Sequence, residues 1–316
     1  MLFSSREESH SITEKEFEKW TKGEFPFVQK DSEKTRYYAT CPECENPIQI
    51  RGLYGNSKKY GAHAGKDVDG LNPFNYENYI YCPRSVQGRR IPKETRKKTT
   101  SPKDITIYNV IRDNFDLIIE FAKKHLGYYI SDDSAKECLR YYYASEGWLY
   151  PHSTVNNIPF ILFYIQSGFN PYGLWIRKGS LLEKAILKSK DLKLEKIDGK
   201  AEEYYSKLLP NSKKFMALTM MVWSHEFAEN ENGELHESVN LEICKNISDD
   251  PERYKWEELV EQKIEIPEAE FVKFINSSHK YRNEELVGYA RQLMPPLELV
   301  QNRQGVRSEE HTSELQ

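Results

Sequence analysis

The sequence lacks a long hydrophobic run. No window of its 316 residues approaches the roughly 18 consecutive apolar residues that a membrane helix requires. The first ten residues, MLFSSREESH, have no apolar centre of the kind a signal peptide needs. A mean hydropathy of -0.75 and a charged fraction of 30% are typical of soluble chains. We therefore expect a cytoplasmic protein without a membrane partner, and the oligomeric state stays open.

The common catalytic fingerprints are missing as well. The chain contains no GxGxxG, GxSxG or HExxH pattern. The segment ending in Gly65 and Lys66 resembles a phosphate loop, but Tyr60 occupies the glycine position and Asp67 the hydroxyl position. The sequence thus predicts no catalytic residue, and it leaves open whether the protein is an enzyme.

Cysteine is scarce, and its number is odd. Three of the five cysteines, Cys41, Cys44 and Cys82, lie in the first third of the chain, whereas Cys138 and Cys244 are isolated. An odd count without a secretion signal does not indicate a disulfide framework. The C-P-E-C pair at Cys41 and Cys44 is typical of a metal knuckle, with a redox pair or a degenerate knuckle as the alternatives. We expect the two isolated cysteines to be packing residues.

The cysteine spacing predicts a zinc site. Two thiolates three residues apart on a tight turn can both reach one zinc ion at about 2.3 Å. Cys82 supplies a third thiolate, but Ser85 stands where a four-cysteine site would have its last ligand.

His63 is the best candidate for the missing ligand. Eighteen residues separate it from Cys44 and eighteen from Cys82, and Gly61 and Gly65 beside it allow close backbone approach. His10 and Asp67 are the alternatives. A set of Cys41, Cys44, His63 and Cys82 would be a closed, structural Zn²⁺ site with no open position for water.

The segment from Cys41 to about Ser85 resembles the zinc-ribbon-like N-terminal region of uncharacterised bacterial proteins that are associated with mobile elements. The resemblance covers about a seventh of the chain. It implies a zinc-ribbon-like module over residues 1–83 and no particular activity. Local patterns within this region predict strands over residues 36–40, 48–53 and 79–81, with an irregular Gly- and Asn-rich stretch before the last strand.

A strongly basic segment follows this module. Residues 84–103 carry eight cationic side chains against the single acid Glu94, a net charge of +7. Nucleic-acid phosphates could be neutralised here, and nearby tyrosines could stack on bases. The residues we assign to nucleic-acid contact are Arg89, Arg90, Arg96, Lys97 and Lys98. The alternative interpretation is that residues 84–100 form a solvated basic linker.

The rest of the chain predicts an α+β fold, with a helical region over residues 101–195 and an α+β region over residues 196–306. Ser101, Pro102 and Asp104 form a helix start, and Gly127 ends that helix. Further helices are expected after Ser131, after Ser153 or Thr154, and over three later ranges: 181–187, 268–275 and 284–293.

Alternating apolar residues predict a long β-hairpin over residues 215–244, with its turn at Asn232 and Gly233. That turn would place Val222 opposite Ile243. The hairpin also carries His225, Glu226, His236 and Glu237, which we interpret as surface polarity, with a metal or acid–base site as the alternative. The complete prediction is an N-terminal zinc-ribbon-like module, a helical middle and a C-terminal hairpin packed with helices.

The last ten residues, RSEEHTSELQ, resemble the conceptual translation of a sequencing adapter. We expect residues 307–316 to be a non-native tail and the natural chain to continue past Val306.

Three functional hypotheses follow from these patterns. The first is a zinc-stabilised binding protein that contacts nucleic acid through the basic segment. The second is a protein-interaction or scaffold component with architectural zinc. The third is an enzyme, built around His225 or carried by sequence beyond residue 306.

Overall fold

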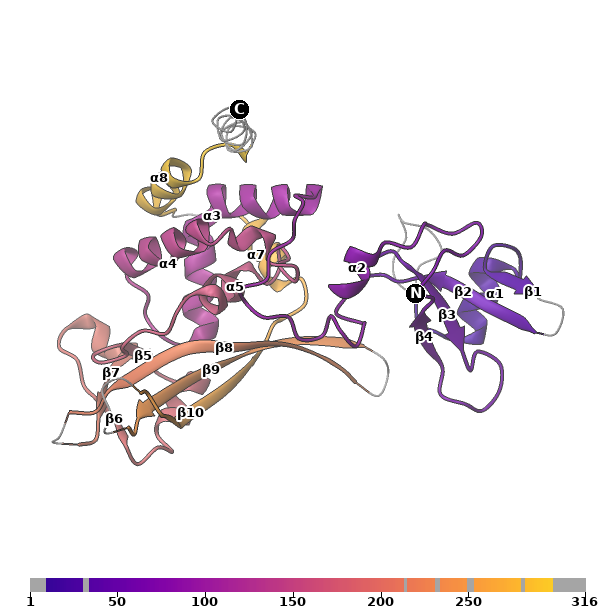
Figure 1. Cartoon of the computed structure of the whole chain (residues 1–316). Coiled ribbons are helices and arrows are strands. Elements are labelled where there is room, and N and C mark those ends of the chain that lie inside the picture. The colour runs from indigo at the N-terminus through magenta and orange to yellow at the C-terminus, as the bar shows by residue number, and fades with distance from the viewer. Residues whose placement is uncertain are drawn as a thin grey trace, which may run out of the picture. The chain divides into compact units, whose positions relative to one another are not determined.

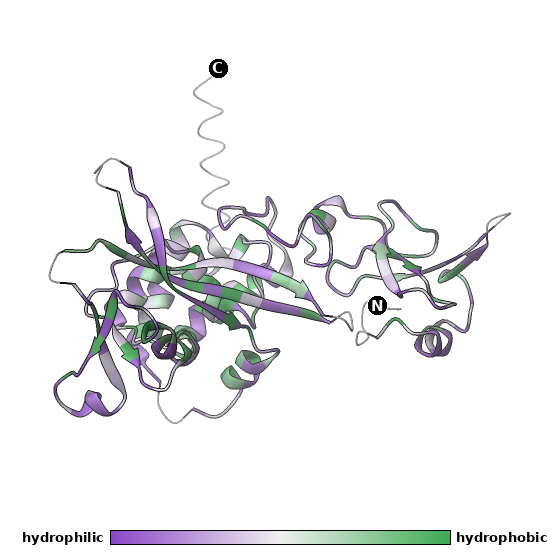
Figure 2. Ribbon diagram, turned by 90° about the horizontal axis from the view of Figure 1, so that it is seen from below, coloured by the Kyte–Doolittle hydropathy of each residue, from purple (hydrophilic) through white to green (hydrophobic). Residues whose placement is uncertain are grey.

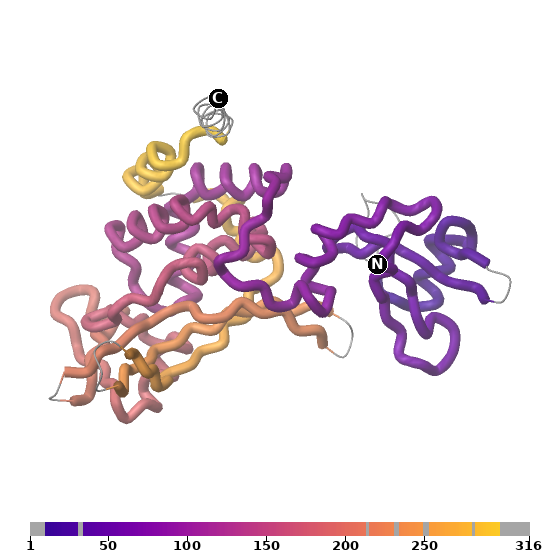
Figure 3. The backbone as a smooth tube through the Cα atoms, in the orientation of Figure 1, coloured from indigo at the N-terminus to yellow at the C-terminus, as the bar shows by residue number. Residues whose placement is uncertain are grey.

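The computed structural model describes residues 10–30, 34–212, 215–230, 234–248, 253–279 and 282–297. Helices and strands both contribute substantially, which confirms the expected α+β class. The chain divides into two compact units, Met1–Ile91 with Phe227–His236, and Pro92–Glu226 with Glu237–Gln316. Figure 3 traces the backbone through them. Among the described residues, no helix is both long and apolar enough to cross a membrane.

The first unit is built on a four-stranded antiparallel sheet (Figure 1). The strands lie in sequence order, so each pairs with the next along the chain. Their bounds are β1 (Val28–Lys30), β2 (Thr35–Thr40), β3 (Pro47–Arg51) and β4 (Tyr60–His63). Helix α1 (Glu14–Thr21) precedes the sheet and buries Phe17 against its core.

The small core of this unit includes all three of its cysteines. Their neighbours in the core are apolar residues of α1, of the sheet and of the loop between β3 and β4: Phe17, Ala39, Ile48, Ile50 and Leu53. Because so few apolar side chains are buried here, the thiols account for a large part of the core. Groups that hold the thiols together therefore contribute directly to the stability of this unit.

Two elements of the first unit correct the sequence predictions. Strand β4 lies in the Gly- and Asn-rich stretch that we expected to be irregular. A side chain at Gly61 would come within 2.7 Å of Ile48 Cδ1, so the glycine lets β4 pair closely with β3. The strand predicted at Tyr79–Tyr81 is instead helix α2 (Tyr76–Ile80), because Asn75 caps it by accepting a hydrogen bond from the Asn78 amide at 2.9 Å.

Helix α3 (Pro102–Leu126) opens the second unit and confirms the predicted boundaries. Ser101 and Asp104 form a reciprocal capping box, and Gly127 ends the helix in the left-handed conformation with φ of 80°. At Asn114 the backbone leaves helical geometry, so α3 is kinked. The sequence analysis did not predict this kink.

The second unit also contains shorter helices and turns: α4 (Asp132–Ala144), η1 (Gly147–Leu149), α5 (Ile158–Ile165), α6 (Leu181–Ile186), η2 (Lys200–Glu203), α7 (Glu270–Ile275) and α8 (Glu284–Leu293). Of these, η1, α5, α7 and α8 pack against α3. The predicted cap of α4 is present, since Ser131 accepts a hydrogen bond from a backbone amide, and Ser180 caps α6 in the same way. Helix α5 begins later than predicted, with Pro159 in its first turn.

Two three-stranded sheets complete the second unit. One contains β5 (Trp175–Arg177), β6 (Leu192–Glu195) and β7 (Tyr205–Pro210) in the order β5-β7-β6. The other contains β8 (Leu218–Glu229), β9 (Leu235–Asn246) and β10 (Trp256–Glu265) in the order β10-β9-β8. The sequence analysis missed the first of these sheets and the strand β10. The predicted hairpin corresponds to β8 and β9, whose turn residues 231–233 lie outside the described residues.

The register of the hairpin differs from the prediction. Asn246 N–H donates to Ala217 O at 2.9 Å, which places Val222 beside Leu241 rather than Ile243. Near the tip, Asn230 N–H donates to Glu234 O at 3.0 Å. Between these two hydrogen bonds, the β8 side of the hairpin contains one residue more than the β9 side. This extra residue acts as a β-bulge, which changes the side-chain alternation along the strand.

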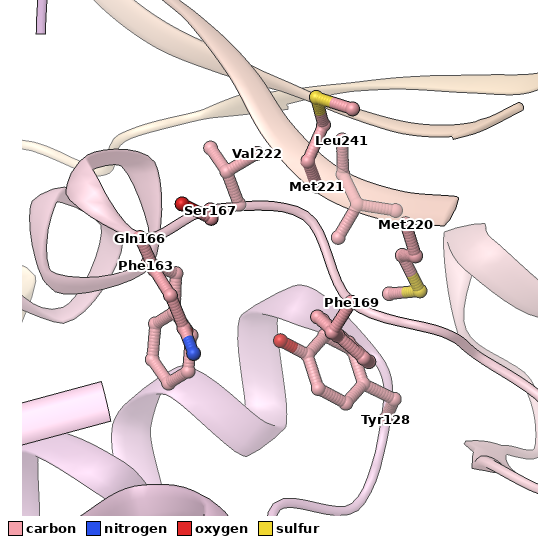
Figure 4. A pocket seen from close by; sticks show the side chains of 9 residues that line it. All are labelled: Tyr128, Phe163, Gln166, Ser167, Phe169, Met220, Met221, Val222 and Leu241. Carbon is pink, nitrogen blue, oxygen red and sulfur yellow. The ribbon is translucent and has the colours of Figure 1, made fainter. Parts of the chain in front are cut away.

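A small cavity lies between this sheet and the helices (Figure 4). Apolar side chains from α5, from strands β8 and β9 and from the loops after α3 and α5 line most of it, and its volume is about 10 Å³. That space admits at most one water molecule. The cavity therefore marks the packing of helix on sheet and offers no room for a ligand.

Candidate metal centre

Three strands and a helix bring the candidate metal ligands together. Cys41 follows the last residue of β2, and Cys44 lies in the turn between β2 and β3. His63 is the last residue of β4, and Cys82 comes two residues after the end of α2. Residues separated by up to 41 positions thus meet at one end of the small sheet.

The geometry of the cluster is compatible with a bound metal ion. All four ligand atoms lie within 4.8 Å of one another. The Sγ atoms of Cys41 and Cys82 are 3.8 Å apart, and Cys44 Sγ is 3.2 Å from His63 Nε2. Zinc bound at about 2.3 Å separates two sulfurs by about 3.8 Å in a tetrahedron. The cluster could therefore hold a metal ion, and its donor types suit zinc.

The thiols of the cluster influence one another's acidity. Hydrogen bonds from Cys41 and Cys82 lower the pKa of Cys44 to about 3, although burial opposes this shift. The pKa of Cys82 is raised by its hydrogen bonds to Cys41 and Cys44 and by burial. In a buried cluster of three thiols, several thiolates need a compensating cation. A divalent metal supplies that charge and displaces the thiol protons.

Asn46 joins the two halves of the site. Its buried side chain donates to Cys44 Sγ at 3.4 Å and to Asn75 O at 3.0 Å, and it accepts from the Asn75 amide at 2.6 Å. Asn75 is also the cap of α2, the helix that leads to Cys82. One amide side chain therefore positions both the cysteine turn and the segment that carries the third thiol.

Ser85 has a role in the turn after Cys82. Its amide donates to Cys82 O, and its hydroxyl accepts a hydrogen bond from the Gly88 amide at 2.8 Å. A side chain at Gly88 would lie 2.1 Å from Cys82 O, so this turn requires glycine. The serine that departs from a four-cysteine pattern thus closes the loop behind the third ligand.

The two alternative fourth ligands lie in other environments. His10 stacks on Trp20 with ring centroids 4.5 Å apart, and its Nδ1 lies 3.7 Å from a Glu16 carboxylate oxygen. Asp67 accepts a hydrogen bond from the Phe74 amide at 2.7 Å. Neither residue belongs to the group of four close ligand atoms, whereas His63 does.

The predicted nucleic-acid residues are divided between the two units, with Arg89 and Arg90 in the first and Arg96, Lys97 and Lys98 in the second. In the first unit, Arg89 forms an ion pair of 3.1 Å with Glu229, while Arg90 is exposed. In the second unit, the Arg96 guanidinium donates to the carbonyls of Lys93, Thr95 and Ser145.

Lys97 forms contacts within the second unit, whereas Lys98 is exposed to solvent. Lys97 pairs with the fully buried carboxylate of Asp104, and its amide donates to Leu149 O. Part of the basic segment therefore anchors the chain to its own helices, whereas Arg90 and Lys98 are exposed to solvent.

His225 and Glu237 are not surface residues as the sequence analysis had interpreted them. The His225 side chain is 0% exposed, with Nε2 2.7 Å from Glu237 Oε1 and Nδ1 3.1 Å from the Tyr150 hydroxyl. The bulge in β8 turns this histidine toward the helices. Glu237 also accepts from the Asn157 amide group, whereas the exposed His236 contacts Asn230. Because the His225 ring is enclosed, this network joins the hairpin to the helices and presents no open acid–base group.

The isolated cysteines are both buried, as expected for packing residues. Burial raises the pKa of the Cys138 thiol, which lies 3.5 Å from Leu162 O. Burial and Glu242 raise the pKa of Cys244 to about 11. Neither thiol is therefore activated as a nucleophile at neutral pH.

Comparisons of this chain with protein-family models, with curated proteins and with solved structures give no match.

Proposed function

We propose that this chain is a binding protein whose first unit is a zinc-ribbon-like module with a structural Zn²⁺ ion. The observation that carries the proposal is the approach of Cys41, Cys44, His63 and Cys82 to within 4.8 Å of one another. Four protein ligands complete the coordination of zinc and leave no position for water, so the ion is architectural. Its place in a small core agrees with that role.

Elemental analysis of the purified chain, after loosely bound metal is removed, tests the zinc assignment. We expect about one zinc ion per chain in the wild type and loss of zinc in the Cys44→Ser and His63→Ala variants. Cys244→Ser and His10→Ala are matched controls, because they replace the same residue types outside the cluster. Absence of zinc from the wild type, or equal loss in the controls, contradicts the proposal.

Nucleic acid is the ligand class that we propose for this binding protein. The support is the net charge of +7 over residues 84–103 and the exposure of Arg90 and Lys98 within that segment. Cations of this kind bind phosphates and release counterions, so affinity falls steeply with salt. Arg96 and Lys97 would act by holding the segment in place.

Fluorescence anisotropy with a labelled oligonucleotide across a salt series tests this ligand class. Arg90→Gln combined with Lys98→Gln should weaken binding and lower the salt slope by about one for each lost phosphate contact. Lys193→Gln combined with Lys196→Gln removes two exposed cations outside the segment and should change neither quantity.

The second candidate function is a protein-interaction or scaffold component. It is favoured by the internal use of Arg96 and Lys97, which leaves fewer cations for phosphate contact. Under this alternative, the Arg90 and Lys98 variant binds the oligonucleotide as the wild type does, with the same weak salt dependence. We expect the zinc content to be unaffected under either alternative. The elemental analysis therefore tests the metal site, and the anisotropy experiment tests the ligand class independently of it.

A further inference from the structure

The sheet of β8, β9 and β10 has two chemically different faces. One face packs on the helices through apolar side chains such as Val222 and Leu241. Side chains alternate along a strand, so their neighbours project to the opposite side. We call this side the outer face, and Figure 2 shows it in front of the helices. Its residues include Trp223, Asn240, Glu242, Cys244, Trp256, Glu258, Glu261 and Lys263.

Strand pairing orders these residues into rows. Glu242 lies directly opposite Glu261, and the next row pairs Asn240 with Lys263. Counting along the hairpin from the hydrogen bond between Asn246 and Ala217 adds Trp223 to the second row. In the other direction, the last row ends with Trp256.

The middle of the outer face has an excess of negative charge. Like charges directly opposite each other on neighbouring strands are unfavourable, and Glu242 and Glu261 are such a pair. The pKa of Glu242 is raised by burial and by the carboxylates of Glu258 and Glu261. Lys263, the nearby cation, is paired with Glu265 at 3.0 Å. The face would therefore be stabilised by cations from outside.

Two exposed tryptophans flank these carboxylates. Trp223 is 59% exposed and Trp256 is 44% exposed, and Tyr254 stacks on Trp256 with ring planes 7° apart. They lie at diagonal corners of the face, about 20 Å apart along the strands. An exposed indole beside carboxylates suits a guanidinium group, which can stack on the ring and donate two hydrogen bonds to a carboxylate.

We propose that the outer face of the β8–β10 sheet binds an arginine-rich segment of a partner protein. An extended segment of about six residues spans the distance between the two tryptophans. The negative charge of the face disfavours phosphates and anionic lipids, so this surface is separate from the proposed nucleic-acid contact. Among the described residues, the metal-ligand atoms that lie close enough to hold an ion are those of the Cys/His cluster. The glutamates of the outer face do not form such a group.

Binding of a fluorescein-labelled Arg-Gly-Ser repeat peptide to the full chain tests this proposal, with a Glu-Gly-Ser repeat as the opposite-charge probe. We expect the arginine peptide to bind and the glutamate peptide not to bind. Trp223→Ala should weaken binding about two- to fivefold, as expected for one exposed cation–π contact. Glu242→Gln combined with Glu261→Gln should weaken it further and reduce its salt dependence.

Matched controls separate this face from general charge effects. Glu120→Gln combined with Glu137→Gln removes two exposed carboxylates from α3 and α4, and Tyr204→Ala removes an exposed aromatic ring elsewhere. These controls should bind the arginine peptide within twofold of the wild type. The proposal is overturned if the wild type does not bind this peptide, or if the control variants weaken binding as much as the face variants do. Sedimentation velocity showing a dimer that Trp223→Ala abolishes, without peptide binding, would assign the face to self-association instead.

Discussion

At the scale of single residues, Asn46 has an importance that its position beside the cysteine pair does not reveal. Its amide reaches Cys44 Sγ on one side and both backbone groups of Asn75 on the other. An N–H···S hydrogen bond stabilises a thiolate, and a fixed ligand loses less entropy when a metal binds. We therefore expect Asn46 to tune the metal affinity although it is not a ligand.

The Asn46→Ala variant should bind zinc about 10- to 100-fold more weakly than the wild type, the usual loss when an outer-shell partner is removed. Competition with a chromophoric zinc chelator measures this affinity. Asn56→Ala, at an exposed asparagine of the same unit, should match the wild type. An unchanged affinity in Asn46→Ala would show that the amide contributes only to folding.

The sequence predicted the cysteines and His63 because thiolate and imidazole chemistry restricts the possible ligands strongly. It could not predict the functions of Asn46 and Ser85, because each depends on a segment far away in the chain or on backbone groups of a specific turn. His225 was misinterpreted for a related reason. A single extra residue in β8 changes the direction of its side chain, and nothing in the local alternation marks that residue.

At the scale of elements, the pairing of β9 with β10 places Glu242 against Glu261 in an otherwise regular antiparallel ladder. Burial and the two neighbouring carboxylates raise the pKa of Glu242 above its ordinary value of 4.5. A carboxyl whose pKa is raised in the folded state binds protons more readily when folded than when unfolded. The stability from this group is therefore present at low pH and is lost as the pH rises through the raised pKa.

We predict that Glu242→Gln stabilises the chain at neutral pH, by about 0.5 kcal/mol in the free energy of unfolding. Near pH 4 the advantage should disappear, because Glu242 is then largely protonated in the wild type. Urea unfolding of both proteins across this pH range measures the difference. Glu120→Gln, on α3, serves as the control, and a constant difference at all pH values would contradict the assigned charge crowding.

Among the elements, those with strong local signals were predictable. The capping residues of α3 and its terminal glycine fixed both boundaries, since they satisfy backbone groups within the helix itself. Strands β5, β6 and β7 have three to six residues and depend on partners distant in sequence, so periodicity did not reveal them. Helix α2 was missed because its cap, Asn75, lies in a loop full of helix-breaking residues.

At the scale of the whole molecule, the two units differ in how their cores are built. The first unit has a small core in which three of the residues are thiols. The second unit buries long apolar stretches of α3 and α5 together with the inner face of a sheet. The hairpin tip, Phe227–His236, groups with the first unit, where Glu229 lies within ion-pair distance of Arg84 and Arg89. Local sequence signals could not predict that the hairpin tip groups with the first unit, because Arg89 and Glu229 are 140 residues apart in the chain.

Because metal binding energy is folding energy in a unit with so small a core, chelation should affect the two units unequally. We expect that removing zinc abolishes hydrogen-exchange protection in β2, β3 and β4 and in the hairpin tip, while α3 and α5 keep theirs. Trp20, the tryptophan of the first unit, should become more exposed, and added zinc should restore both signals. Hydrogen-exchange mass spectrometry with and without a chelator makes this measurement, with the Cys44→Ser variant as a zinc-free reference. Equal loss of protection in both units would mean that the chain folds as a single cooperative body, whereas full protection without metal would mean that the thiol core is stable by packing alone.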